Sequence, residues 1–245
     1  MNRGTVALVT GANRGLGKET ARQLAHRGMT VLLGSRDLDR GDEVARELAA
    51  EGADIRAVRL DVTDAAGVDE AAERLRSEHG RLDVLVNNAG TIAEGLALDV
   101  TATNLRHTFE VNVFGVVTAI HTMLPLLRRS VAPRIVNVSS TTASLTLTGS
   151  AADIPGDATR RLAYTSSKAA LNMLTLQYAL AFDRDPESSH IKINSASPGY
   201  VATDMNSFRG THSVVEGARV IVRLASLPDD GPTGGFFHAD GPVPW

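Results

Sequence analysis

The chain of 245 residues contains no cysteine. This absence excludes disulfide bonds, a catalytic thiolate and a metal site with cysteine ligands. A strong charge of one sign is also missing, because 25 basic and 28 acidic residues leave a formal net charge of -3. We therefore expect neither nucleic acid nor a membrane surface as a partner.

Other signatures of function and location are missing too. The seven histidines are dispersed and form no His-x-x-x-His pair, so we expect no catalytic metal. The sequence has no Gly-x-Ser-x-Gly elbow, which argues against a serine hydrolase. We find no signal peptide and no apolar stretch long enough to span a bilayer, so we expect a cytoplasmic protein.

Short apolar runs alternate with helical patterns along the whole chain, and no linker or repeat interrupts them. We expect strands at Val6–Thr10, Thr30–Leu33, Ile55–Leu60, Val84–Val86, Ile135–Val138, Ile191–Asn194 and near Phe236–Phe237. We expect helices at Lys18–His26, Asp39–Ala50, Gly67–His79, Thr103–Leu127, Tyr164–Phe182 and Val215–Leu224. This order predicts one α/β domain over residues 1–245: a doubly wound parallel sheet of the Rossmann type, with helices on both faces and its ligand at the carboxyl ends of the strands.

A glycine-rich turn follows the first expected strand. Residues 10–17 read Thr-Gly-Ala-Asn-Arg-Gly-Leu-Gly, directly before a helical pattern. Gly11 can turn tightly, Gly15 lets a ligand approach the backbone, and Gly17 lets helix and strand pack closely. The turn is therefore a candidate cradle for a pyrophosphate. Its spacing is one residue longer than the common dinucleotide fingerprint, so a glycine-rich turn without a ligand remains the alternative.

The residues after the second strand bear on the choice of cofactor. A guanidinium there binds the 2′-phosphate of NADP, whereas a carboxylate binds the 2′-hydroxyl of NAD. Arg36 comes first, and Arg14 in the glycine turn could reach the same phosphate. The two arginines favour NADP. If the strand ends one residue later than we expect, Asp37 could serve the 2′-hydroxyl instead.

Polar residues also follow the later strands, at Asn87-Asn88-Ala89-Gly90 and at Ser139-Ser140. Each pair alone is typical of ordinary turns. Tyr164 and Lys168 are spaced to share one face of a helix, where the ammonium would lower the pKa of the phenol toward neutrality. That spacing alone is more typical of an exposed helix face. Asn112 lies inside a long apolar pattern, where a buried amide needs hydrogen-bond partners.

In this combination and order, the motifs resemble the short-chain dehydrogenase/reductase family from Thr5 to nearly the C-terminus. The resemblance implies a catalytic tetrad of Asn112, Ser140, Tyr164 and Lys168. Ser140 is chosen because members with the same lead-in use the second serine. It implies cofactor binding by Gly11, Asn13, Arg14, Gly15, Leu16, Gly17, Arg36, Asp61, Val62, Asn88, Ala89, Gly90, Tyr164, Lys168, Pro198, Gly199, Val201 and Thr203.

Within that family the chain resembles the NADP-preferring carbonyl reductases. The resemblance implies that NADPH reduces a ketone or aldehyde, a small-molecule partner. Tyr164 would donate the proton, Ser140 would bind the carbonyl oxygen, Lys168 would hold the nicotinamide ribose, and Asn112 would order a relay water. The alternatives are an NAD-linked alcohol dehydrogenase, a nucleotide-sugar epimerase, and a nucleotide-sensing regulator without catalysis.

The segment Thr141–Ala163 departs from the family pattern. It is longer than the usual spacing from serine to tyrosine, yet much shorter than in monomeric carbonyl reductases, so both a monomer and a homo-oligomer remain open. Long ordered loops at strand ends are usually functional. We therefore expect this segment to form a flap over the substrate, with Thr91–Leu98 and Tyr200–Ser213 completing the pocket.

Overall fold

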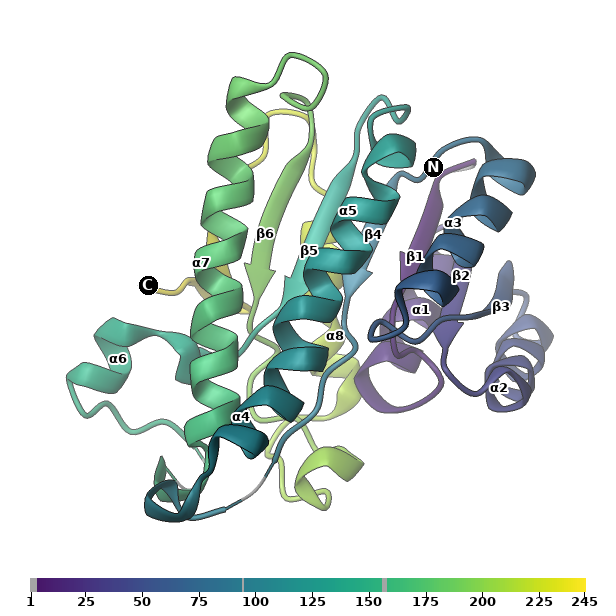
Figure 1. The fold of residues 1–245 in the computed structure, drawn as a ribbon. Coiled ribbons are helices and arrows are strands. Elements are labelled where there is room, and N and C mark those ends of the chain that lie inside the picture. Colours follow the sequence, from purple (N-terminus) through teal and green to yellow (C-terminus); the bar gives the residue numbers. More distant parts are fainter. Residues whose placement is uncertain (1–3, 94, 156–157) are drawn as a thin grey trace.

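The computed structural model describes residues 4–93, 95–155 and 158–245. In this part of the chain eight strands form one sheet in the order β3-β2-β1-β4-β5-β6-β7-β8. They are β1 (Val6–Val9), β2 (Thr30–Ser35), β3 (Ile55–Arg59), β4 (Val84–Asn87), β5 (Arg134–Val138), β6 (Lys192–Ala196), β7 (Phe236–His238) and β8 (Gly241–Pro242). The first seven pair in parallel, and β8 pairs antiparallel with β7. Figure 1 shows β1 to β6 side by side.

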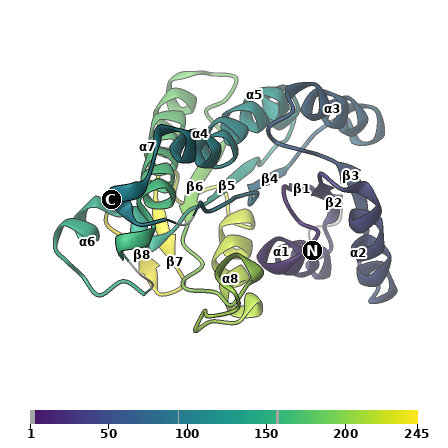
Figure 2. The same ribbon diagram turned by 60° about the horizontal axis from the view of Figure 1, so that its bottom comes forward.

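Helices cover both faces of the sheet. They are α1 (Gly15–His26), α2 (Leu38–Ala50), α3 (Ala65–His79), α4 (Ala102–Phe109), α5 (Gly115–Leu127), α6 (Leu145–Gly149), α7 (Leu162–Arg184) and α8 (Val214–Ala225). Figure 2 shows α1, α2 and α8 on one face and α3, α5 and α7 on the other. Ala7 and Val9 point into the first of these layers, whereas Val6 and Leu8 point into the second. The expected doubly wound fold is confirmed.

The elements agree with the expected ones apart from their ends and several short additions. β2 continues to Ser35 because Gly34 and Ser35 pair with β3. The sequence did not predict α6, β8 or the π-helical turn Glu110–Phe114 that joins α4 to α5. None of these additions has a hydrophobic period long enough to be recognised.

The continuous helical stretch Ala102–Leu127 also differs from expectation. Its length of 26 residues, with a mean hydropathy of 1.4 in its most apolar 18-residue window, would let it cross a membrane by length and composition alone, contrary to the sequence-based expectation. A single helix of this kind is weak evidence, since core helices of soluble proteins pass the same test. Half of its most apolar window is buried, and Val116, Ile120 and Met123 belong to the core between α5 and the sheet.

The order of the strands creates a crevice where β1 and β4 lie side by side. The chain leaves these two strands toward helices on opposite faces, so their loops diverge at the carboxyl ends. The side-chain amide of Asn88 bridges them, because Nδ2 donates to the carbonyls of Thr10 (2.8 Å) and Gly11 (3.0 Å). The glycine turn and the loop after β4 therefore meet at the position where a doubly wound sheet binds its ligand.

Close packing at Gly115 gives a test of this fold. A Cβ there would lie 2.6 Å from Cγ2 of Val62, so we predict that Gly115→Ala lowers the free energy of unfolding by about 1–3 kcal/mol through overpacking. Gly149→Ala is the control, because no atom lies within 4 Å of its Cβ position. That change should stay within about 0.5 kcal/mol of the parent protein. Equal effects in denaturant unfolding would contradict the packing described.

Candidate active site

A cleft of about 1940 Å³ runs along the carboxyl edge of the sheet. Every predicted cofactor or catalytic residue lines it, except Asn112. The cleft is larger than a typical single-ligand pocket of roughly 300–1,000 Å³. It therefore has room for a dinucleotide and a second molecule together.

The glycine turn is shaped for close approach by a ligand. Gly11 and Gly15 have positive φ angles of 61° and 52°, which favour glycine. A Cβ on Gly17 would lie 2.5 Å from the carbonyl oxygen of Gly11 and would also collide with the side chain of Asn88. Helix α1 begins at Gly15, and its N-cap Arg14 makes no side-chain capping bond. Backbone N–H groups at this helix end thus fit a pyrophosphate.

Arginines lie at the expected adenosine end of the cleft. Because β2 ends at Ser35, Arg36 is the first residue beyond the strand, and it is exposed and lines the cleft. Arg40, one helical turn later, lines it too. The sequence did not single out Arg40, because only the folded turn from β2 into α2 brings it to the cleft beside Arg36. The carboxylate of Asp37 caps α2 by accepting from the N–H of Arg40 (3.2 Å).

Arg14 has a partner that the sequence did not reveal. Its Nη1 lies 2.6 Å from Oδ2 of Asp204, which follows Thr203 in the loop after β6. Both side chains are exposed. A cofactor phosphate approaching Arg14 would have to compete with this carboxylate.

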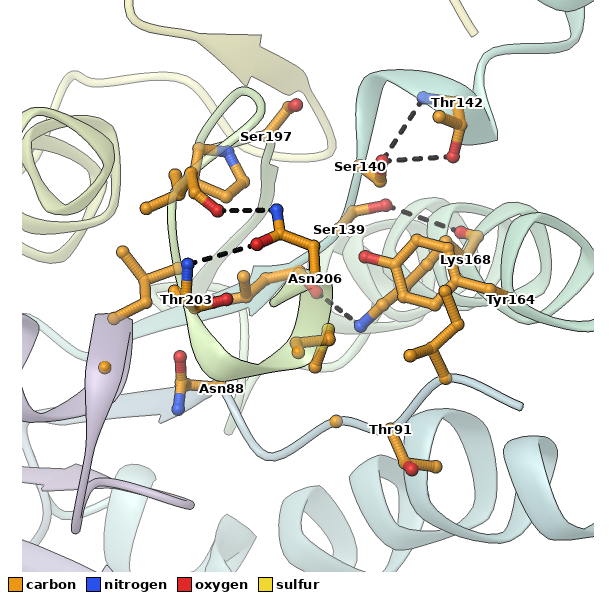
Figure 3. Close-up of a pocket in the computed structure, with 18 of the residues that line it drawn as sticks. Asn88, Thr91, Ser139, Ser140, Thr142, Tyr164, Lys168, Ser197, Thr203 and Asn206 are labelled. Carbon is orange, nitrogen blue, oxygen red and sulfur yellow. Dashed lines mark hydrogen bonds between the residues drawn. The ribbon is translucent and has the colours of Figure 1, made fainter. Parts of the chain in front are cut away.

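Tyr164 and Lys168 project from the first turns of α7 into the cleft near Ser139 and Ser140 (Figure 3). The Ser140 hydroxyl lies near enough to the phenol of Tyr164 to lower the pKa of that phenol, and it accepts from Oγ1 of Thr142 (3.0 Å). Ser139 is buried instead, and its hydroxyl donates to the carbonyl of Lys168 (3.5 Å). Of the two adjacent serines, Ser140 is thus the one in contact with the phenol.

Burial controls the titration of this pair. It raises the pKa of Tyr164, and the neighbouring Ser140 hydroxyl offsets part of that effect. The expectation that the ammonium lowers the pKa of the phenol is therefore wrong for this structure. Nζ of Lys168 lies 5.8 Å from the ring centroid and donates to the carbonyl of Val138 (2.8 Å). Burial also lowers the pKa of Lys168 to about 8.

Asn112 lies behind the cleft in the π-helical turn and is completely buried. Its Oδ1 accepts from the N–H of Thr91 (2.8 Å). Its Nδ2 donates to the carbonyl of Thr91 (2.9 Å) and to the hydroxyl of Ser167 (3.0 Å). Both donors are therefore used within the protein, and one acceptor site remains on Oδ1. The geometry makes Asn112 a residue that positions the loop after Gly90.

The loop after β6 forms the wall beside the glycine turn. The hydroxyl of Ser197 accepts from the N–H of Thr141 (2.9 Å), which ties this loop to Ser140. The side chain of Asn206 donates to the carbonyl of Val201 (2.9 Å) and accepts from the N–H of Thr203 (3.2 Å). The sequence did not single out Asn206, although it is the last residue of the capping pattern Thr203-x-x-Asn206.

The segment Thr141–Ala163 reaches the cleft, in line with the expected flap. Of its described residues, Leu147, Ile154 and Pro155 are among those that line the cleft. Figure 1 shows α6 beside the beginning of α7. Residues 156 and 157 lie outside the described part, so the segment is known only on either side of them.

Comparisons with known proteins agree with this geometry. The profile of the short chain dehydrogenase family matches residues 5–213. The chain is 34% identical to (-)-isopiperitenone reductase of Mentha piperita, with 96% of each chain covered. It is 36% identical to (+)-neomenthol dehydrogenase of Arabidopsis thaliana, covering 94% of this chain and 95% of that one. The solved structure of salutaridine reductase from Papaver somniferum superposes with a TM-score of 0.82 at 29% identity, covering 96% and 99%.

The buried ammonium predicts an unusual dependence of stability on pH. The pKa of Lys168 falls from 10.5 to about 8 on folding. The unfolded chain therefore binds the proton more tightly, and stability should rise as the pH increases from 8 to 10.5. Lys168→Met removes the charge at similar length. We predict that it stabilises the cofactor-free protein by about 1–3 kcal/mol at pH 7 and that this gain disappears near pH 10.5.

Denaturant unfolding at both pH values measures this effect. Lys192→Met is the control, because Lys192 is only partly buried at the start of β6. A Lys168→Met protein that is less stable at pH 7, with no change toward pH 10.5, would contradict the burial described.

Proposed function

We propose that this chain, which belongs to the short-chain dehydrogenase/reductase family, reduces a ketone or aldehyde to an alcohol with NADPH as the hydride donor. Members of this family are oxidoreductases that use a nicotinamide cofactor. The observation that carries the proposal is the half-buried phenol of Tyr164 beside Ser140, in a cleft whose other end holds Arg36 and Arg40. Two of the similar proteins are named as reductases.

Tyr164 is suited to act as the general acid. Because burial raises its pKa, the phenol carries its proton at neutral pH and can give it to an oxygen that gains negative charge. The hydroxyl of Ser140 lies beside it and would bind the same carbonyl oxygen. Two fixed donors at a water-poor site stabilise such a charge without reorganisation. NADPH, when bound, supplies the hydride.

Lys168 would hold the ribose next to the nicotinamide. Nζ uses one donor on the Val138 carbonyl and has two more. A Cβ on Gly90 would lie 3.6 Å from Nζ, so the backbone leaves room there for a hydroxyl group. The loop after β6 would bind the carboxamide of the nicotinamide through Val201 and Thr203, which Asn206 fixes in place.

The charges at the adenosine end support NADP over NAD. Arg36 and Arg40 both lie at the cleft, and each charge-assisted hydrogen bond to a phosphate contributes about 1.5–3 kcal/mol. The carboxylate of Asp37, which would favour NAD, is engaged as the cap of α2. Asp37 nevertheless lines the cleft, so an NAD-linked alcohol dehydrogenase is the second candidate.

Titration of both cofactors decides between them. We predict that Arg36→Ala weakens NADPH binding about 10- to 100-fold and leaves NADH binding nearly unchanged. Arg46→Ala is the matched control, since Arg46 is exposed on α2 outside the cleft. Equal losses of affinity for NADPH and NADH would show that Arg36 does not bind the 2′-phosphate.

The acid role of Tyr164 has its own test. Tyr164→Phe should lower kcat about 10²- to 10⁴-fold while fold and NADPH affinity survive. Tyr178→Phe on the same helix is the control, because its ring packs on Phe182 away from the cleft. NADPH oxidation with aldehydes, simple ketones, quinones and polycyclic ketones measures both variants. Full kcat in Tyr164→Phe would favour another donor or a regulator without catalysis.

A further inference from the structure

Two histidines that the proposed chemistry does not use converge beyond the catalytic residues. A Cβ on Gly199 would lie 3.2 Å from Nε2 of His238 and 3.3 Å from Nε2 of His212. The two ring centroids are 6.3 Å apart. Both rings are half-buried and line the cleft. Because glycine has no side chain, the edges of both rings can lie close to the same side of Gly199.

The sheet register places this position on the substrate side of the cleft. The N–H of Ser139 donates to the carbonyl of Ala196 (2.7 Å), and the N–H of Ser197 donates to that of Phe237 (2.7 Å). The carboxyl ends of β5, β6 and β7 are therefore level. Since adjacent strands are about 4.8 Å apart, His238 lies about 10 Å from Ser139. A substrate whose carbonyl oxygen lies at Ser140 would extend toward the two imidazoles.

Contacts around His238 orient its ring. Nδ1 lies 3.0 Å from Oδ2 of Asp240, and the guanidinium of Arg223 donates to the carbonyls of His238 (2.8 Å) and Ala239 (3.1 Å). A neutral ring that donates from Nδ1 to the carboxylate presents Nε2 as an acceptor. In this tautomer His238 can accept a hydrogen bond from a donor in the cleft.

His212 is held by the loop beside the nicotinamide site. Its N–H donates to the carbonyl of Tyr200 (3.0 Å), and its carbonyl accepts from the N–H of Ala202 (2.8 Å). The position of the backbone is thus fixed, while Nε2 points toward Gly199. In the described part of the chain, no group of three His, Cys, Asp or Glu residues could hold a metal ion. A metal is therefore not the occupant that the pair suits.

We propose that His238 and His212 bind a hydroxyl group of the carbonyl substrate, distant from the carbonyl that is reduced. A hydroxyl both donates and accepts, so it can donate to His238 and accept from the Nε2–H tautomer of His212. A carboxylate fits less well, because Asp240 already places a negative charge on the His238 ring. The neighbouring wall is apolar at Leu147 and Val243. The inferred substrate class is a hydroxylated ketone with an apolar, ring-sized spacer, and this inference rests on the proposed function.

A matched pair of substrates tests this directly. One is a fused-ring ketone with a hydroxyl on the ring distal to the carbonyl, and the other lacks only that hydroxyl. We expect His238→Leu and His212→Leu each to lower kcat/KM for the hydroxylated ketone about 5- to 50-fold, mostly through KM. The unsubstituted ketone should change less than twofold. His238→Gln should keep part of the preference, and His121→Gln, on the exposed surface of α5, should keep all of it.

The outcomes distinguish a failure of the hydroxyl-binding inference from a failure of the proposed function. Equal losses for both ketones would mean that the histidines only shape the pocket, and a preference for the ketone with a carboxylate in place of the hydroxyl would assign them to an anion. Either result overturns the inference and leaves the proposed function intact. If the parent protein binds NADPH yet reduces neither ketone nor any carbonyl of the panel, the proposed function fails first.

A readout without turnover covers variants that do not fold. In NMR spectra of the parent protein with NADP⁺, the imidazole signals of two of the seven histidines should shift when the hydroxylated ketone is added. The unsubstituted ketone should leave them in place. Identical spectra with the two ketones would overturn the inference.

Discussion

A buried ammonium determines how the catalytic end of this protein is arranged. Lys168 is almost completely buried, and the carbonyl of Val138 accepts from its Nζ. This contact fastens α7 to the carboxyl end of β5, so that Tyr164, one turn earlier on α7, meets the Ser140 hydroxyl just beyond that strand. Burying a charge is unfavourable, and the lowered pKa of Lys168 reflects that cost. The geometry that makes the phenol useful thus depends on a locally destabilising residue, as is common at functional sites.

Two asparagine side chains hold the loop after β4 in place in the cleft. A loop has few backbone partners of its own, and its N–H and C=O groups must still be satisfied. Asn88 joins the beginning of the loop after β4 to the glycine turn, and Asn112 joins Thr91 to the π-helical turn. An asparagine side chain resembles a peptide group and can therefore continue the pattern of backbone hydrogen bonds. The loop between these amides is fixed at both ends, and Gly90 within it leaves room beside Nζ of Lys168.

The sequence predicted the parts of the site that follow from local patterns. The ends of parallel strands must meet at one edge, so the residues after the strands were expected together and do line one cleft. The direction of the pKa shift at Tyr164 was not predictable, because the spacing to Lys168 says nothing about burial. The partner of Arg14 was missed for a related reason. Asp204 lies far along the chain, and only the folded loop after β6 brings its carboxylate to the glycine turn.

The shapes of the two ends of the cleft have different physical causes. At the cofactor end, positive φ angles and missing side chains shape the backbone, and such constraints are visible as glycines in the sequence. At the substrate end, contacts between distant segments decide the shape. Thr146 of α6 donates to the carbonyl of Trp245 (2.6 Å), whose ring stacks on Phe236 of β7 at 5.6 Å. Since β7 also carries His238, the segment over the cleft is fastened to the strand that bears this histidine. A change in that segment is therefore transmitted to the substrate side of the cleft, while the backbone contacts of the glycine turn stay as they are.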